Sequence, residues 1–159
     1  MKLLIKNGRV VHPVTSAVIL QDILIEDGKI VLIERGLEAE ADQVIDASRM
    51  VVYPGLINTH HHLYQLFSRN LPEVQRMELF PWLVTLYDVW KNLDEEVVAT
   101  SSLVGMAELL KTGCTTCFDH HYVFPQNAGD LLGAQLEAAQ TLGIRMVLSR
   151  GSMDLSRKD

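Results

Sequence analysis

The sequence has few cysteines, no block of basic residues and no long apolar run, and each shortage narrows the class of protein. Only two of its 159 residues are cysteine, which favours a reducing compartment such as the cytoplasm over a disulfide-stabilised secreted scaffold. The formal net charge is -6, and the lack of a basic cluster argues against nucleic acid as the main partner. No apolar run is long enough to span a bilayer, and the run after Met1 is too short for a signal peptide. We therefore expect neither a membrane helix nor a secreted protein.

The remaining composition is that of a folded globular chain, with 48% hydrophobic and 21% charged residues. Its first part carries short strand-like runs at 3–11, 22–26, 29–34, 43–46 and 50–53. The strongest turn signal between them is Asp27-Gly28, a typical hairpin pair. Short strands make a thin core. We therefore expect residues 1–53 to be a small β-sandwich portion completed by another part of the protein.

Strand and helix patterns alternate from residue 54 onward. Helices are predicted from Pro81, after Asp94, and after a cap at Asn127 or Asp130. Strands are predicted at 51–57, 114–119 and 144–148, and residues 64–79 form a long loop with a helical turn. This alternation is typical of parallel β/α units with right-handed crossovers. In such units, polar groups at the carboxyl ends of the strands share one rim, where ligands bind.

The first of these strand ends carries three histidines, His60-His61-His62, after an apolar run that starts at Pro54-Gly55. Alternate side chains of a strand share a face, so His60 and His62 point together and His61 points away. Two neutral imidazoles at one strand end can clamp a divalent ion such as zinc or iron. An exposed polar strand end or an expression tag is the other interpretation, and the Pro-Gly-apolar lead-in argues against a tag. We predict a metal site with His60 and His62 as ligands.

These residues resemble a known family. The stretch from Val52 to His62, together with Val44-Ile45-Asp46-Ala47, resembles the amidohydrolase superfamily, in which His-x-His ends the first barrel strand. Residues 60–65, 119–122 and 150–153 are similar to the 8-oxoguanine deaminase group within that superfamily. This group is close to the triazine aminohydrolases and the guanine deaminases.

The resemblance implies an α/β fold. Residues 54–159 would be the first three β/α units of a TIM-like (β/α)8 barrel, preceded by the β-sandwich portion at 1–53. Three units cannot close such a barrel, so we expect an N-terminal segment of a longer protein; completion by a partner chain is the alternative. The family's general acid and its other metal ligands lie on later strands. No catalytic residue is therefore assigned, because those groups are expected beyond residue 159.

The resemblance also implies a metal-dependent aminohydrolase. One divalent ion, with zinc expected and iron as the alternative, would lower the pKa of a bound water. The hydroxide would attack the amino-bearing ring carbon of an oxidised purine of the 8-oxoguanine type, and ammonia would leave. A triazine or guanine aminohydrolase is the alternative enzyme, and a non-catalytic metal-holding module is the alternative from another class. The expected partner is thus a small heterocyclic molecule, and the sequence leaves open whether the protein is a homo-oligomer.

Four residues near the predicted strand mouths are candidate substrate contacts: Gln65, Trp82, His121 and Arg150. Gln65 can donate and accept at a purine edge or lie in solvent, and Arg150 can fork onto a ring carbonyl or form a salt bridge. Trp82 can stack on a ring, although a role as a core anchor of its helix is favoured. His121, whose neighbour His120 faces the opposite way, is expected to contact substrate or support the ligands, with packing as the alternative.

Cys114 and Cys117 have the C-x-x-C spacing of redox and zinc motifs. Residues i and i+3 of a strand point to opposite faces, and no second pair exists. We therefore interpret both as buried apolar residues.

Overall fold

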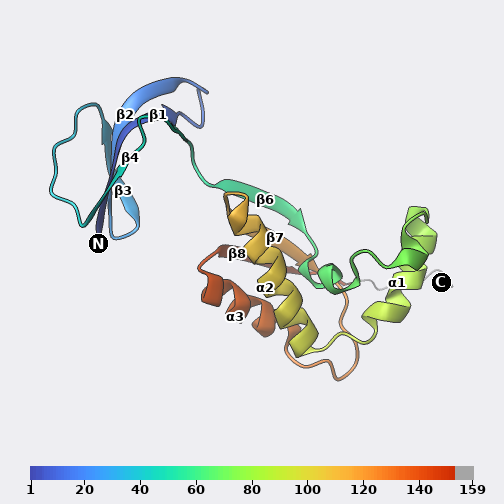
Figure 1. Cartoon of the computed structure of the whole chain (residues 1–159). Coiled ribbons are helices and arrows are strands. Elements are labelled where there is room, and N and C mark those ends of the chain that lie inside the picture. The colour runs from blue at the N-terminus through green and yellow to red at the C-terminus, as the bar shows by residue number, and fades with distance from the viewer. Residues whose placement is uncertain (153–159) are drawn as a thin grey trace. The chain divides into compact units, whose positions relative to one another are not determined.

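The structure is a computed structural model that describes residues 1–152. The chain divides into two compact units, Met1–Pro54 and the part from Gly55 onward. The first unit is built from strands, and the second alternates strands and helices (Figure 1). Among the described residues, no helix combines the length and apolar content needed to cross a bilayer. The mixed α/β class predicted from the sequence is confirmed.

The first unit is a single five-stranded sheet. Its strands are β1 (Lys2–Val11), β2 (Val18–Glu26), β3 (Lys29–Glu34), β4 (Gln43–Asp46) and β5 (Val51–Val52). The order is β3-β2-β1-β4, with β5 also paired to β1. β2 runs antiparallel to both β1 and β3, whereas β4 and β5 run parallel to β1. The β2–β3 hairpin turns at Asp27 and Gly28, whose φ values of 47° and 77° are those the Asp-Gly signal predicts.

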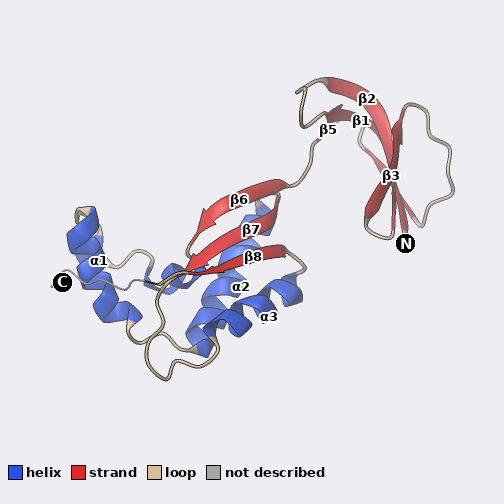
Figure 2. Ribbon diagram, turned by 180° about the vertical axis from the view of Figure 1, so that it is seen from behind, coloured by secondary structure: helices blue, strands red, loops and turns tan. Residues whose placement is uncertain are grey.

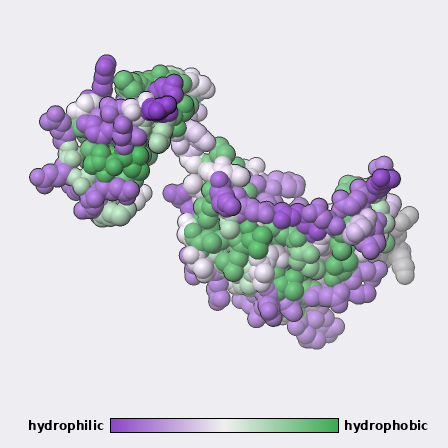
Figure 3. Space-filling model, in the orientation of Figure 1, coloured by the Kyte–Doolittle hydropathy of each residue, from purple (hydrophilic) through white to green (hydrophobic). Residues whose placement is uncertain are grey.

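The core of this sheet is small, as its short strands predict. Leu4, Leu24 and Leu37 form its buried cluster, whereas β3 is exposed along its whole length, including Ile30 and Ile33. Apolar side chains accordingly gather on the surface of this unit (Figure 3). The described part of the unit holds one sheet, so the β-sandwich stays a prediction.

Asp22 ties β2 to the bulge in β1 and to the loop after β3. Its carboxylate is 3% exposed and accepts hydrogen bonds from the backbone N–H groups of Asn7 (2.6 Å) and Leu37 (2.8 Å). Asn7 sits where an extra residue interrupts the β1–β2 register, with a φ of 60°. Burial raises the pKa of Asp22, but these hydrogen bonds and Lys6 at 3.8 Å outweigh it and hold the pKa below 3.8. The charged carboxylate therefore satisfies an N–H that the bulge leaves outside the ladder.

The second unit contains a parallel three-stranded sheet covered by two helices. Its strands β6 (Leu56–His61), β7 (Cys114–His121) and β8 (Arg145–Arg150) lie in that order. Helix α2 (Glu95–Lys111) links the first pair and α3 (Leu131–Leu142) the second, and both cover the same face (Figure 2). Met106 of α2, Ala138 and Ala139 of α3, and Cys117 of β7 share one buried cluster. The predicted parallel β/α alternation is confirmed.

Helices α2 and α3 begin at the predicted capping residues, whereas α1 begins earlier than predicted. Asp94 and Asp130 cap α2 and α3, because their side chains accept hydrogen bonds from the N–H groups of residues 97 and 133. Gly143, with a φ of 71°, ends α3. Helix α1 (Leu79–Trp90) begins before Pro81. Proline fits at that third position because the first four N–H groups of a helix have no partner within it.

Two 3-10 turns, η1 (Leu63–Ser68) and η2 (Pro72–Val74), connect β6 to α1 where a loop with one helical turn was predicted. Tyr64 and Trp90 are fully buried and pack edge to face at 5.4 Å. The Trp90 indole N–H donates to the Ser68 hydroxyl at 3.0 Å. These contacts anchor η1, which directly follows the three histidines, against α1.

Replacement of Asp22 should destabilise the first unit. Asp22→Ala leaves two backbone N–H groups without their acceptor, which should lower the free energy of unfolding by about 1–3 kcal/mol. Because the native pKa lies below that of an unfolded aspartate, this difference should be fully present at neutral pH and shrink as the pH falls through the native pKa. Urea unfolding of the purified protein at several pH values measures it.

Asp42→Ala is the matched control, since this exposed carboxylate also accepts a backbone N–H, that of Lys2, at 2.7 Å. The Asp42→Ala substitution should lower the free energy of unfolding much less than Asp22→Ala. Equal losses of stability in the two variants, or an Asp22→Ala effect that does not change with pH, would contradict a stabilising role for the buried Asp22 carboxylate.

Candidate functional site

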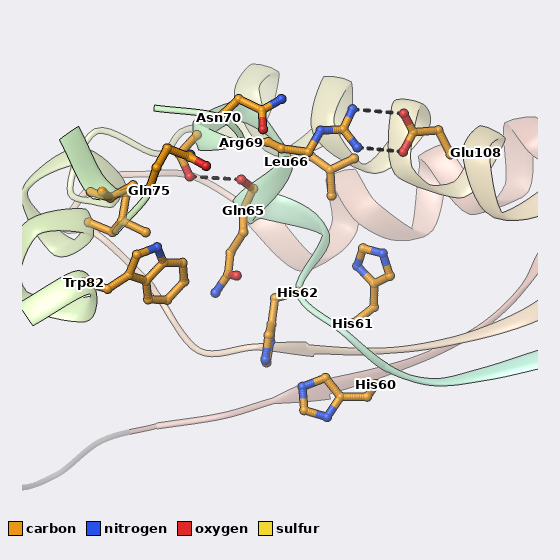
Figure 4. Close-up of a pocket in the computed structure, with 13 residues that line it drawn as sticks. His60, His61, His62, Gln65, Leu66, Arg69, Asn70, Gln75, Trp82 and Glu108 are labelled. Carbon is orange, nitrogen blue, oxygen red and sulfur yellow. Dashed lines mark hydrogen bonds and ion pairs between the residues drawn. The ribbon is translucent and has the colours of Figure 1, made fainter. Parts of the chain in front are cut away.

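The carboxyl end of β6 brings His60 and His62 to one side of the strand and His61 to the other (Figure 4). The β6–β7 register shifts twice: β7 carries an extra residue between the pairs Leu56↔Cys114 and Ile57↔Thr116, and β6 carries one between Asn58↔Cys117 and His61↔Asp119. The second shift is a bulge at Thr59 and His60, which together oppose one residue of β7. The side chains of His60 and His62 nevertheless lie together, as strand alternation predicts.

The His62 ring has a defined orientation. Its Nδ1 lies 2.7 Å from the carbonyl oxygen of His120 on β7. A carbonyl oxygen only accepts, so Nδ1 carries the proton and Nε2 keeps a free lone pair. Metal-binding histidines are commonly oriented by such a bond from the other ring nitrogen. This geometry prepares His62 to bind a cation through Nε2.

The two imidazoles are also correctly spaced for one ion. The ring centroids of His60 and His62 are 5.1 Å apart, at an interplanar angle of 80°. Two imidazoles on one tetrahedral zinc, with Zn–N of about 2.0–2.1 Å, would have centroids about 5 Å apart. In residues 1–152, no third His, Cys, Asp or Glu side chain joins them to form a metal-binding group. This pair therefore fits two of the ligand positions of a divalent ion.

A cleft of about 520 Å³ opens beside the histidines. Gln65 and Trp82 line it, together with His60, His61, His62 and residues of η1, η2, α1 and α2. The Arg69 guanidinium pairs with both carboxylate oxygens of Glu108 at 2.9 and 3.0 Å across part of this cleft. The volume is in the usual range for small-molecule sites. Two of the four predicted substrate residues therefore lie beside the histidine pair.

Gln65 is held by two tyrosines, neither of which the sequence analysis singled out. Its amide nitrogen donates to the Tyr122 hydroxyl at 3.1 Å and lies 3.4 Å from the Tyr64 hydroxyl. Tyr122 also packs edge to face on His62, with ring centroids 5.1 Å apart. Strand alternation could have indicated Tyr122, because it follows His120 by two residues and should therefore lie on the same face of β7. The tyrosines thus fix the side chain that separates the histidines from the rest of the cleft.

Trp82 is anchored in the core and also lines the cleft. Its ring packs edge to face on the buried Trp90 at 5.5 Å, among residues of the core cluster. It also lines the cleft opposite His62 (Figure 4). It is therefore a core anchor with one edge available to a ligand.

His121 lies away from the cleft in this structure. It is fully buried, its Nε2 lies 2.9 Å from the carbonyl oxygen of Val123, and its ring packs on Tyr64 and Phe124. Burial lowers its pKa below 6.5, which keeps the imidazole neutral. Alternation along β7 places His121 on the helix-covered face with Cys117 and Asp119, while His120 is exposed. These contacts favour packing, and a role toward substrate or metal ligands stays a prediction.

Arg150 also lies outside the cleft. It pairs in register with His121 across the β7–β8 ladder, and paired residues of parallel strands share a face. Its guanidinium stacks over the Phe124 ring, 4.7 Å from the centroid. The contact is a cation–π interaction, and the fork onto a substrate carbonyl stays a prediction.

Cys114 and Cys117 are free and buried, as predicted. Burial raises the pKa of Cys117 to about 12, so its thiol stays protonated and unreactive at neutral pH. The two cysteines are therefore core residues and not a redox or zinc motif.

Asp119 is the polar residue nearest this site that sequence reasoning missed. It is fully buried, and its two carboxylate oxygens accept from the backbone N–H of Leu63 at 2.6 Å and from the Gln135 amide at 3.0 Å. Leu63 directly follows His62. No sequence pattern links these positions, because the bond spans 56 residues.

Comparison with known proteins places these features in a family. The model described as the amidohydrolase family matches residues 51–159. The 8-oxoguanine deaminase of Pseudomonas aeruginosa is 47% identical over 141 residues, which cover 86% of this chain and 31% of that protein. The hydroxydechloroatrazine ethylaminohydrolase of Pseudomonas sp. strain ADP is 37% identical, with coverage of 84% and 31%. The chain thus spans about a third of the length of these curated relatives.

Among solved structures, the atrazine chlorohydrolase of Arthrobacter aurescens, complexed with zinc, matches with a TM-score of 0.91 at 30% identity. The match covers 98% of this chain and 37% of that chain. The similarity therefore extends over both units.

The histidine geometry predicts how metal content responds to substitution. His60→Ala and His62→Ala should each remove most of the zinc from the purified protein, because each deletes one of only two imidazoles on that side of β6. His61→Ala is the control, since its ring points to the other side and should leave zinc content unchanged. Metal analysis of the three variants decides; zinc loss confined to His61→Ala would contradict this placement of the ligands.

Proposed function

The chain belongs to the amidohydrolase family, and on this premise we propose that it forms part of a metal-dependent aminohydrolase acting on a nitrogen heterocycle. The reaction is hydrolysis of the bond between a ring carbon and its amino group, with release of ammonia. One divalent ion, zinc, is the proposed cofactor. The relatives that support this assignment are deaminases and a triazine-type aminohydrolase, of which this chain spans about a third.

The observation that carries the proposal is the pair of imidazoles beside the cleft. His60 and His62 lie on one side of β6 at a spacing that fits one ion, and the cleft of about 520 Å³ begins at the same residues. When bound there, a divalent ion supplies an activated water at neutral pH and polarises the ring position under attack. A pocket next to such an ion has the elements of a hydrolytic site.

The described residues contribute ligand orientation and substrate contacts. His62 is held by its Nδ1–H bond to His120, so its Nε2 is directed to the ion. Gln65 presents its amide from η1 into the cleft and can hydrogen-bond to the edge of a heterocycle. Trp82 offers an aromatic edge from α1 on the same cleft. In this arrangement Gln65 and Trp82 hold a flat polar ring against the metal side, and neither is a metal ligand.

The proposed substrate class is an oxidised purine of the 8-oxoguanine type. The support is the 47% identity to the 8-oxoguanine deaminase of Pseudomonas aeruginosa. A substituted triazine is the second candidate, favoured by the hydroxydechloroatrazine ethylaminohydrolase and by the structural match to atrazine chlorohydrolase. Both candidates are flat heterocycles with ring nitrogens and exocyclic amines, which suits a cleft lined by an amide and an indole.

Product release from a panel of heterocycles tests the proposal. Zinc-loaded full-length protein should release ammonia from 8-oxoguanine faster than from guanine, and faster than it releases an amine from hydroxylated triazines. Protein stripped of metal by chelation should be inactive and should recover when zinc is restored. If no heterocycle yields ammonia or amine from zinc-loaded protein, the non-catalytic metal-holding module becomes the correct interpretation.

Gln65 should matter for the substrate and not for the metal. Gln65→Leu removes a hydrogen-bonding group from the cleft and should lower kcat/KM by roughly ten- to a hundredfold, with zinc content unchanged. The matched control is Gln75→Leu, because Gln75 lines the same cleft but uses its amide on the Leu71 carbonyl, away from the histidines. A wild-type kcat/KM for Gln65→Leu, or an equal loss for Gln75→Leu, would remove Gln65 from the substrate contacts.

A further inference from the structure

The end of β6 pairs with β7 irregularly, through a bulge before the last register pair, His61↔Asp119. Regular pairing with β7 is interrupted between Asn58 and His61, where β6 carries an extra residue. A bulge of this kind leaves a residue unpaired and lets the strand bend. Contacts beyond the single His61↔Asp119 pair therefore help to fix the position of His60 and His62.

Two adjacent residues of β7 supply such contacts on both sides of His62. The carbonyl of His120 accepts from the His62 ring at 2.7 Å, and the carboxylate of Asp119 accepts from the next peptide N–H, that of Leu63, at 2.6 Å. The first bond orients the imidazole, and the second fixes the backbone from which it projects. Both bonds join the two strands immediately after the bulge.

Asp119 caps the start of η1, where the His62 side chain does not. His62 is the residue that precedes η1, and its side chain makes no capping hydrogen bond. Its ring is directed to the His120 carbonyl instead. Without Asp119 the Leu63 N–H at the start of η1 would lack a partner in a fully buried position, which is destabilising. The Asp119 carboxylate takes the place of the missing cap, and its charge suits a helix N-terminus.

The second oxygen of Asp119 is fixed as well. It accepts from the Gln135 amide of α3 at 3.0 Å, and both side chains are fully buried. Asp119 lies on the helix-covered face of β7, whereas the adjacent His120 is exposed. Both carboxylate oxygens are thus occupied on the face away from solvent, which makes Asp119 a support for the ligand and not a ligand itself.

We propose that Asp119, held by Gln135, is a positioning residue that fixes His62 as a metal ligand. This inference rests on the proposed metal-dependent function and deepens it. The carboxylate acts through the Leu63 backbone, and it connects helix α3 to the metal side of β6 without contact with ion or substrate. Groups of this kind typically change metal affinity by 10–100-fold when removed.

The test compares variants of the full-length protein by zinc affinity, in competition with a chelator, and by the visible spectrum of the cobalt-substituted form. Asp119→Ala should weaken zinc binding by roughly 10–100-fold and change the cobalt spectrum, because His62 loses its fixed backbone. Asp119→Asn keeps an oxygen for Leu63 and can donate to the Gln135 Oε1, which is buried without a partner among the described residues. It should therefore restore most of the affinity.

Two further variants separate positioning from general stability. Gln135→Leu should weaken zinc binding in the same direction but less than Asp119→Ala, and it tests the inference even if Asp119→Ala does not fold. Asp94→Ala also removes a carboxylate bound to a backbone N–H, that of Val97 at 2.8 Å. It should lower the unfolding temperature and leave zinc affinity and the cobalt spectrum unchanged. Wild-type affinity and spectrum in Asp119→Ala, or equal changes in Asp94→Ala, would overturn the inference.

A separate readout distinguishes failure of this inference from failure of the proposed function. If the wild-type protein binds no zinc, the metal-dependent function fails, and the side-chain ¹⁵N resonances of the metal-free protein still test positioning. His62 should be the Nδ1–H tautomer in the wild type and a mixture of tautomers in Asp119→Ala. An unchanged tautomer would overturn the positioning role.

Discussion

Two hydrogen bonds attach β7 to His62 and to the peptide that follows it, and the rest of the site depends on this attachment. The bulge in β6 interrupts the regular pairing just before His61, and the bonds to the His120 carbonyl and the Asp119 carboxylate add a fixed attachment after it. The turn that starts at Leu63 then delivers Gln65 to the cleft and, through Ser68, is tied to Trp90. One local attachment therefore connects the histidine pair, Gln65 and the helix that lines the cleft.

Burial separates the histidines into two chemical classes. His61 and His121 have lowered pKa values because burial disfavours the charged form, so both are neutral at physiological pH. His121 is fully buried, whereas His61 is half-buried and lines the cleft. His60 is exposed, and His62 directs its Nε2 away from the His120 carbonyl. The arrangement keeps cationic imidazolium out of the core and leaves two imidazoles available to an ion.

The local elements of the fold were predictable, and the long-range contacts of the site were not. Asp94, Asp130, Gly143 and the Asp27-Gly28 turn act over three or four residues, so their sequence signals sufficed. The His60 and His62 pairing followed from strand alternation. Alternation shows which residues share a face but not which face the helices cover, so it did not show that His121 and Arg150 lie outside the cleft. Asp119 was missed because its partners, Leu63 and Gln135, are assembled only by tertiary packing.

The central claim is that His60 and His62 bind one ion through a site whose geometry β7 holds in place. Anomalous diffraction at the zinc absorption edge, from crystals of the zinc-loaded full-length protein, tests it most directly. The account predicts one zinc peak about 2.0–2.1 Å from Nε2 of both histidines, with Nδ1 of His62 still bonded to the His120 carbonyl. A zinc bound through Nδ1 of His62, or an ion on the His61 side of β6, would contradict it.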